Sequence, residues 1–375
     1  MTVLVIIVIA LIAFITYFYF RPRRPKSSVN IPYLESLIAE LENNEELAIK
    51  KLKEALNIDT NLVAGYIRLG NLYRKRGDIE RAIKIHQSLT VRPTLRREEE
   101  KKIYFSLVED YLASNRPNRA ISFLREILKI DRNDEKARDL LLKIYEDLQS
   151  YQECIALSEE YPEQIDVQRL AYYYAAHAHA LSTDAGNEPE EKSKEVQQLL
   201  KKALKIKPDS VSALFYNAEF YKNIGDLRKA KEYYTKILEL QPNFAFLILT
   251  DFEKVAYETG HFEQIIPLYE KIFKANPKNF AVGFALANLY EKKNEIEQAR
   301  SIYRKTGELY PEAVLPHIYL MKLSGESKEI KKEIAEIEKI LLPYKFVCQK
   351  CGTKIPKFNF LCLNCRAVES YLPQL

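Results

Sequence analysis

Four cysteines near the C-terminus are the residues whose types and spacing most clearly predict chemistry. Cys348, Cys351, Cys362 and Cys365 form the pattern C-x2-C-x10-C-x2-C. A tight turn in each C-x-x-C pair can bring two thiolates to one metal ion, and two such turns complete a tetrahedral site of four sulfurs. Because such a site has no open position for a substrate, we expect a structural metal ion. The spacing leaves both zinc and iron open as the metal.

The first twenty residues predict an element that holds the chain at a membrane. Residues 1–20 carry no charged side chain, and twenty residues of helix rise about 30 Å, which matches the hydrocarbon core of a bilayer. Aromatic residues at 17–20 fit an interfacial belt and stand where a signal peptide would need small residues. The linker at 21–28 contains four basic residues, so the positive-inside rule places the rest of the chain in the cytoplasm.

A cytoplasmic location bears on the chemistry of the cysteines. Two disulfides would be typical of a secreted chain, whereas the cytoplasm keeps thiols reduced. A redox-active C-x-x-C would need a thioredoxin-like βαβ setting, which the sequence lacks. We therefore expect the four cysteines to bind one metal ion.

A repeat of about 34 residues fills the middle of the chain. Prolines at the ends of the later units are spaced 34, 35 and 34 residues apart, at Pro208, Pro242, Pro277 and Pro311. A mostly small side chain recurs in the second helix of each unit, at steps of 34, 38, 34, 42, 34, 35 and 34 residues: Ala48, Ala82, Ala120, Cys154, Val196, Ala230, Ile265 and Ala299. These two markers predict eight helix pairs between about 29 and 313, with a ninth pair from Leu315 as a cap. The polar segment at 182–194 is expected to be an exposed loop.

The repeat unit that begins at Val63 resembles the tetratricopeptide repeat. A glycine and an aspartate, Gly77 and Asp78, follow its first helix. Glycine tolerates a left-handed backbone there, and aspartate can cap the second helix. Stacked helix pairs form a superhelix with a concave wall. We therefore predict an all-α solenoid at 29–343 between the transmembrane helix and a rubredoxin-like ribbon at 344–375.

The concave wall of such a solenoid usually binds a peptide or protein segment. Five polar residues on first helices are expected to point into this groove and to contact a protein partner: Asn71, Arg74, Lys75, Lys222 and Asn223. The alternative, that these positions are solvated and bind nothing, stays open at this stage.

Nothing in the sequence predicts an enzyme. Charged residues make up 29% of the chain and the net charge is +5, with acids and bases interleaved, so we expect no nucleic-acid partner. The five histidines form no H-E-x-x-H motif, and no Walker A loop, G-x-S-x-G or G-x-G-x-x-G occurs. His86 lies at a packing position of its repeat. The sequence leaves self-association, including a homodimer, open.

The order of anchor, repeats and ribbon resembles the lipopolysaccharide assembly protein B family over essentially the whole chain. The stretch at 69–89, the Arg92-Pro93 pair and the ribbon cysteines carry the likeness, although Phe360, Leu363 and Val368 replace residues that are typical of the family. The resemblance implies an adaptor at the bacterial inner membrane with its repeats in the cytoplasm. It also implies two protein partners: the deacetylase that commits precursors to lipid A, and a membrane-anchored AAA+ protease that degrades this enzyme. The ribbon is expected to pack against the repeats.

Two other functions remain open from the sequence. A four-sulfur iron site in a rubredoxin-like ribbon can carry one electron. The ribbon could also bind RNA through lysines that alternate with Phe358 and Phe360. Both alternatives compete with the adaptor hypothesis.

Overall fold

The computed structural model describes residues 30–93, 95–164, 166–183, 190–310, 313–324 and 345–374. The chain divides into two compact units, Met1–Ile144 and Tyr145–Leu375. The predicted anchor at 1–20 and linker at 21–28 lie outside the described residues, as do residues 325–344 of the capping pair. None of the helices in the described ranges is long and apolar enough to cross a membrane. The anchor therefore stays a prediction.

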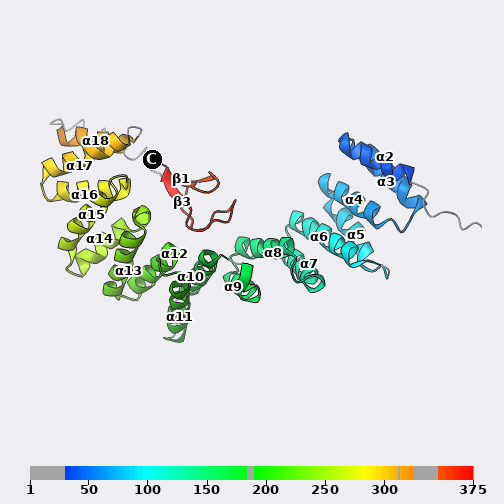
Figure 1. Ribbon diagram of the computed structural model, residues 1–375, viewed down its shortest axis with the longest axis horizontal. Coiled ribbons are helices and arrows are strands. Elements are labelled where there is room, and N and C mark those ends of the chain that lie inside the picture. Colours follow the sequence, from blue (N-terminus) through cyan, green and yellow to red (C-terminus); the bar gives the residue numbers. More distant parts are fainter. Residues whose placement is uncertain are drawn as a thin grey trace, which may run out of the picture. The chain divides into compact units, whose positions relative to one another are not determined.

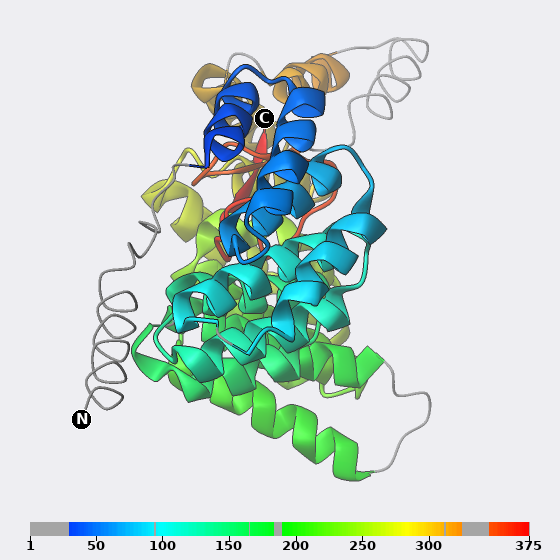
Figure 2. The same ribbon diagram turned by 90° about the vertical axis from the view of Figure 1, so that its right-hand side faces the viewer.

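The first unit consists of consecutive helix pairs, in which α2 packs against α3, α4 against α5, and α6 against α7 (Figure 2). A side-chain oxygen of Asn44 caps α3, and one of Asp78 caps α5. Gly77 takes a φ of 83° before Asp78, as the turn requires. The helices are α2 (Ile31–Leu41), α3 (Glu45–Ile58), α4 (Val63–Lys75), α5 (Ile79–Thr90), α6 (Arg97–Ala113) and α7 (Pro117–Ile130), and α8 (Glu135–Asp147) crosses into the second unit.

The second unit continues the helix pairs and adds three short strands. Asp226 caps α13 after Gly225, which takes a φ of 82°, and so repeats the turn seen at Gly77. The helices are α9 (Tyr151–Glu160), η1 (Pro162–Gln164), α10 (Val167–Thr183), α11 (Glu190–Ile206), α12 (Val211–Asn223), α13 (Leu227–Leu240), η2 (Pro242–Leu247), α14 (Leu249–Glu258), η3 (Phe262–Gln264), α15 (Ile265–Ala275), α16 (Phe280–Lys292), α17 (Ile296–Leu309) and α18 (Val314–Ser324).

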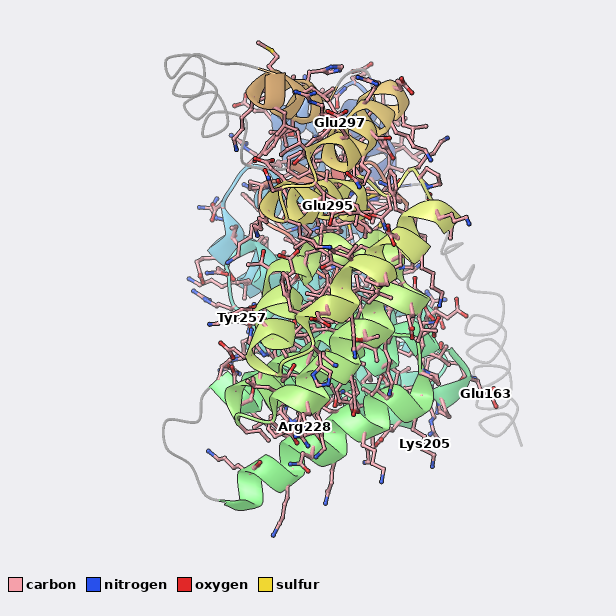
Figure 3. All side chains as sticks on the ribbon, turned by 90° about the vertical axis from the view of Figure 1, so that its left-hand side faces the viewer. Glu163, Lys205, Arg228, Tyr257, Glu295 and Glu297 are labelled. Atoms are coloured by element: carbon pink, nitrogen blue, oxygen red, sulfur yellow. The ribbon has the colours of Figure 1, made fainter. Side chains whose placement is uncertain are left out.

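The repeat markers found in the sequence are core residues. All eight positions of the small-residue series are buried, and Cys154 among them is fully buried, as expected. Close approach of two helices leaves little room at these sites. Exposed charged side chains, such as Lys205, Arg228 and Glu297, cover the outer surface instead (Figure 3). The 34-residue period thus predicted the inner and outer faces correctly.

Two details of the repeats differ from expectation or go beyond it. The loop predicted at 182–194 is shorter, because α10 continues to Thr183 and α11 begins at Glu190. His86 is fully buried, and its Nδ1 lies 2.5 Å from Oδ2 of Asp110. Arg74 contacts the other oxygen of Asp110 at 2.6 Å. A buried ionic network therefore links α4, α5 and α6.

The C-terminal ribbon forms a three-stranded antiparallel sheet. Its strands are β1 (Lys345–Cys348), β2 (Lys354–Ile355) and β3 (Tyr371–Gln374), in the order β2-β1-β3. Within the second unit, α10 to α18 curve around the strands, which lie inside the curve (Figure 1). This placement brings the ribbon against first helices of the repeats.

Candidate metal centre and its attachment to the repeats

Two equivalent turns build the cysteine cluster. In the first turn, the amide of Gly352 donates to the carbonyl of Cys348 (2.8 Å). In the second, the amide of Arg366 donates to the carbonyl of Cys362 (2.9 Å). The residue after each second cysteine takes a left-handed backbone, with a φ of 74° at Gly352 and 59° at Arg366. Such turns aim both thiols of a C-x-x-C pair at one point.

The separations of the sulfur atoms fit one tetrahedral ion. The Sγ atoms of the four cysteines all lie within 4.8 Å of one another. Cys348 and Cys365 are 3.7 Å apart, and Cys351 and Cys362 are 3.6 Å apart. Four sulfurs at about 2.3 Å from a central zinc would lie about 3.8 Å apart, whereas a disulfide bond is about 2.05 Å long. The four predicted ligands can therefore hold one metal ion, with zinc and iron both allowed.

Hydrogen bonds around the sulfurs support this chemistry. The Thr353 hydroxyl lies 3.1 Å from Sγ of Cys351, and Tyr371 donates to Sγ of Cys362 (3.3 Å). The bonds from Thr353 lower the pKa of the Cys351 thiol to about 6. Burial instead raises the pKa of Cys365 to about 12. Loading the site with metal must therefore release at least one proton, and metal affinity should rise with pH.

Arg366 joins the second cysteine turn to the repeats. Its guanidinium contacts Oδ1 of Asp147 (2.7 Å) and lies 3.4 Å from Oε2 of Glu146. The Glu146 side chain is fully buried and also accepts a hydrogen bond from Arg169 (2.6 Å). Removing one partner from a buried ionic group is strongly destabilising, so Arg366 is a strong point of attachment.

Glu369 makes the second polar attachment, at the N-terminus of α12. Its Oε1 accepts hydrogen bonds from the Ser210 hydroxyl, the Ser212 hydroxyl and the Ser212 amide, each at 2.8 Å. Its Oε2 accepts one from Nε2 of Gln168 (3.2 Å). The first amides of a helix have no partner within the helix, and the helix dipole favours an anion there. Glu369 thus supplies from the ribbon the anionic cap of a repeat helix.

Aromatic side chains fill the space between these polar contacts. Phe360 is buried against Phe215 and Tyr216 of α12, with ring centroids 5.6 and 5.5 Å apart. Phe358 lies edge-on to Phe246 of η2 at 5.6 Å. The two phenylalanines that the RNA hypothesis requires are therefore packed against the helices. The expectation that the ribbon packs on the repeats agrees with these contacts.

The five groove residues predicted from the sequence do not form one cluster. Arg74 also contacts Glu109 (2.5 Å), beside Asp110 in the next repeat, and Lys75 pairs with Glu45 (2.9 Å). Lys222 pairs with Glu219 and Asp251. Asn71 is half-buried and Asn223 is exposed. These contacts give Arg74 and Lys222 a role within the repeats, and partner binding by all five residues stays a prediction.

Three residues of the attachment were missed in the sequence: Gln168, Arg366 and Glu369. Gln168 and Glu369 are separated by 201 positions, and no local pattern connects them. The signal that was available is the missing glycine after Cys365, which marks Arg366 as a residue kept in a left-handed turn.

Comparison with known proteins agrees with this architecture. Tetratricopeptide repeat family models match residues 66–99, 218–244 and 256–315. Lipopolysaccharide assembly protein B of Haemophilus influenzae is 27% identical over 325 residues, which cover 82% of this chain and 78% of that protein. Its Escherichia coli counterpart is 24% identical over 347 residues, which cover 89% of this chain and 86% of that protein. This chain resembles lipopolysaccharide assembly protein B. The resemblance inferred from the sequence is therefore confirmed.

Solved structures include a tetratricopeptide repeat protein from Parabacteroides merdae. It is 14% identical, with a TM-score of 0.29, and the match covers 82% of this chain and 97% of that one.

Proposed function

We propose that this chain is an inner-membrane adaptor that regulates lipopolysaccharide biosynthesis. In this proposal, it promotes degradation of the deacetylase that commits precursors to lipid A, through a membrane-anchored AAA+ protease. The observation that carries the proposal is the likeness to lipopolysaccharide assembly protein B over 82% to 89% of the chain.

The site supports a scaffold more than a catalyst. Four cysteines can saturate one tetrahedral ion, so no ligand position is left for a substrate. The ribbon's Arg366 and Glu369 are both used in contacts with the repeats. The metal centre thus serves to hold a surface together, as an adaptor that binds other proteins requires.

The location at the inner membrane, with repeats and ribbon facing the cytoplasm, rests on residues 1–20 and the basic linker at 21–28. An adaptor for a membrane-anchored protease would gain effective concentration from such a tether. A variant that lacks residues 1–20 should therefore bind its partner in vitro and work poorly in cells.

The half-life of the deacetylase in cells, measured before and after depletion of this chain, tests the function. A longer half-life after depletion is the expected result. An unchanged half-life would overturn the degradation role. Normal degradation in cells that contain only the variant without residues 1–20 would show that tethering is not needed.

A further inference from the structure

A cavity of about 850 Å³ lies between the ribbon and the last repeats of the second unit. One wall comes from the ribbon, with Phe346 of β1 and Leu372 of β3, and the opposite wall comes from α16 (Figure 1). Cavities of this volume typically bind small ligands or a few residues of a peptide. Neither the repeats nor the ribbon alone would enclose this space, so the docked ribbon completes it.

The floor of the cavity is aromatic and its rim is polar. Four phenylalanines from separate elements line it: Phe246, Phe280, Phe284 and Phe346. The rim includes Asn288 and two lysines, Lys278 and Lys292. The cavity therefore combines an apolar surface with hydrogen-bond donors and positive charge.

The two rim lysines differ from Lys222 of an earlier repeat. Lys222 is neutralised by Glu219 and Asp251, at 2.7 and 3.3 Å. Within the described part of the chain, neither Lys278 nor Lys292 makes an ion pair. Glu253 is the carboxylate that lines the cavity, and burial raises its pKa, which makes it a weak counter-charge. The rim thus carries positive charge that no acidic group of the chain balances by contact.

A change of residue in the repeat series creates this imbalance. Glu219, Glu253 and Asn288 occupy equivalent first-helix positions, 34 and 35 residues apart. Tyr234 donates to Glu219 (2.5 Å), and the equivalent Tyr303 donates to Oδ1 of Asn288 (2.7 Å). Since the hydroxyl of Tyr303 occupies the amide oxygen of Asn288, the NH2 group remains as a donor. An acid in two repeats has become a donor in the third.

The spacing along α16 indicates what these groups would recognise. Phe284, Asn288 and Lys292 are four residues apart, so they lie on one helix face about one turn, or 5.4 Å, from each other. This distance is close to that between an apolar side chain and the carboxylate of one C-terminal residue. An internal acidic residue would place its apolar neighbour on a different side of the peptide.

The geometry points to a binding site for the free C-terminus of a partner protein whose last residue is apolar, with the side chain on the phenylalanine floor and the carboxylate at Asn288 and Lys292. This inference rests on the proposed adaptor function and assigns it a recognition site. Because Phe346 and Leu372 belong to the ribbon, the site also depends on the metal-bearing domain.

Fluorescence anisotropy on the full-length chain in detergent micelles tests the site. The probe is fluorescein-labelled Gly-Ser-Gly-Ser-Ala-Phe with a free C-terminal carboxylate. Three comparison peptides carry a C-terminal amide, a terminal serine in place of phenylalanine, or an internal glutamate before an amidated phenylalanine. We expect the free-acid probe to bind at least about tenfold more tightly than each comparison peptide.

Substitutions in the cavity locate the binding. Lys292→Glu and Leu372→Asp should each weaken probe binding at least about tenfold, the second through the ribbon wall. Lys271→Glu makes the same charge change at an exposed position of α15 and should leave binding unchanged. Unaltered metal content and circular dichroism would show that the variants are folded.

The outcomes separate this site from the adaptor function. Equal binding of the acid and amide probes, or unchanged binding by Lys292→Glu, would overturn the site while deacetylase turnover could remain normal. Tight binding of the internal-glutamate peptide would exclude a C-terminal ligand. Probe binding as expected, together with an unchanged deacetylase half-life after depletion, would support the site and refute the proposed client pathway.

Discussion

Replacing Glu369 by glutamine should detach the ribbon from α12 without removing its metal ligands. The substitution keeps the size of the side chain and removes its charge. Oε1 can still accept from Ser210 and Ser212, but the new amide NH2 then faces the amide of Gln168, which now donates to Oε2. Two donor groups would meet where one donor and one acceptor meet in the native chain.

The expected loss is worked from the hydrogen bonds that Glu369 accepts. A bond to a charged acceptor contributes about 1.5–3 kcal/mol, and a bond to a neutral one about 0.5–1.5 kcal/mol. The difference is about 1 kcal/mol for each of the four bonds. Bonds to one carboxylate are not additive and Glu369 is only half-buried, so we expect a total of about 2–3 kcal/mol.

Hydrogen exchange at the Ser212 amide measures this effect directly, because that amide donates to Glu369 (2.8 Å). A loss of about 2–3 kcal/mol corresponds to roughly 30- to 150-fold faster exchange where local opening controls the rate. Glu163→Gln, at an exposed position in η1 (Figure 3), is the matched control and should leave the rate unchanged. Unaltered exchange in Glu369→Gln would refute the view that this carboxylate attaches the ribbon.

Three more predictions test other parts of the chain. Cys348→Ser should lose the metal and loosen the ribbon while the first unit stays folded, and an intact metal content by elemental analysis would remove the four-sulfur site. Asp110→Asn leaves Arg74 and His86 without their buried carboxylate, so the free energy of unfolding from urea titration should fall by about 3–5 kcal/mol, and a fall of less than about 1 kcal/mol would contradict an ionic network. Burial lowers the pKa of His179, which stacks on Tyr216 at 4.4 Å; the unfolded chain therefore binds the proton more readily, and stability should decline as the pH falls below about 6.5. His179→Gln should reduce that decline in thermal unfolding at pH 5.5 against pH 7.5, and an identical decline would assign it to other groups.

The sequence predicted those features that depend on local spacing. The helix pairs follow from side chains that recur with the 34-residue period, since each must be buried between two helices. The metal site follows from two C-x-x-C turns, whose geometry is set within four residues. The predicted loop at 182–194 was too long because polar composition does not distinguish a loop from the solvated end of a helix, as at α11.

Contacts between repeats and between domains were beyond sequence reasoning. Arg74 was predicted to face a partner, yet its carboxylate neighbours Glu109 and Asp110 come from the next repeat. A single first helix shows a basic residue and gives no sign of the acid that lies opposite. The same limit applies to Glu369, whose partners Ser210 and Ser212 lie more than 150 positions away.

The backbone at the second cysteine turn explains why metal content and ribbon attachment should behave as one equilibrium. Arg366 directly follows the ligand Cys365, and Glu369 comes three residues later; both take a left-handed backbone, with φ of 59° and 52°. Residues other than glycine hold that conformation only where surrounding contacts compensate for it. The metal-binding turn orients Arg366 toward Asp147, and the docked position in turn stabilises the turn. Loss of the ion should therefore weaken both attachments, and loss of the attachments should lower the affinity for the ion by the same free energy.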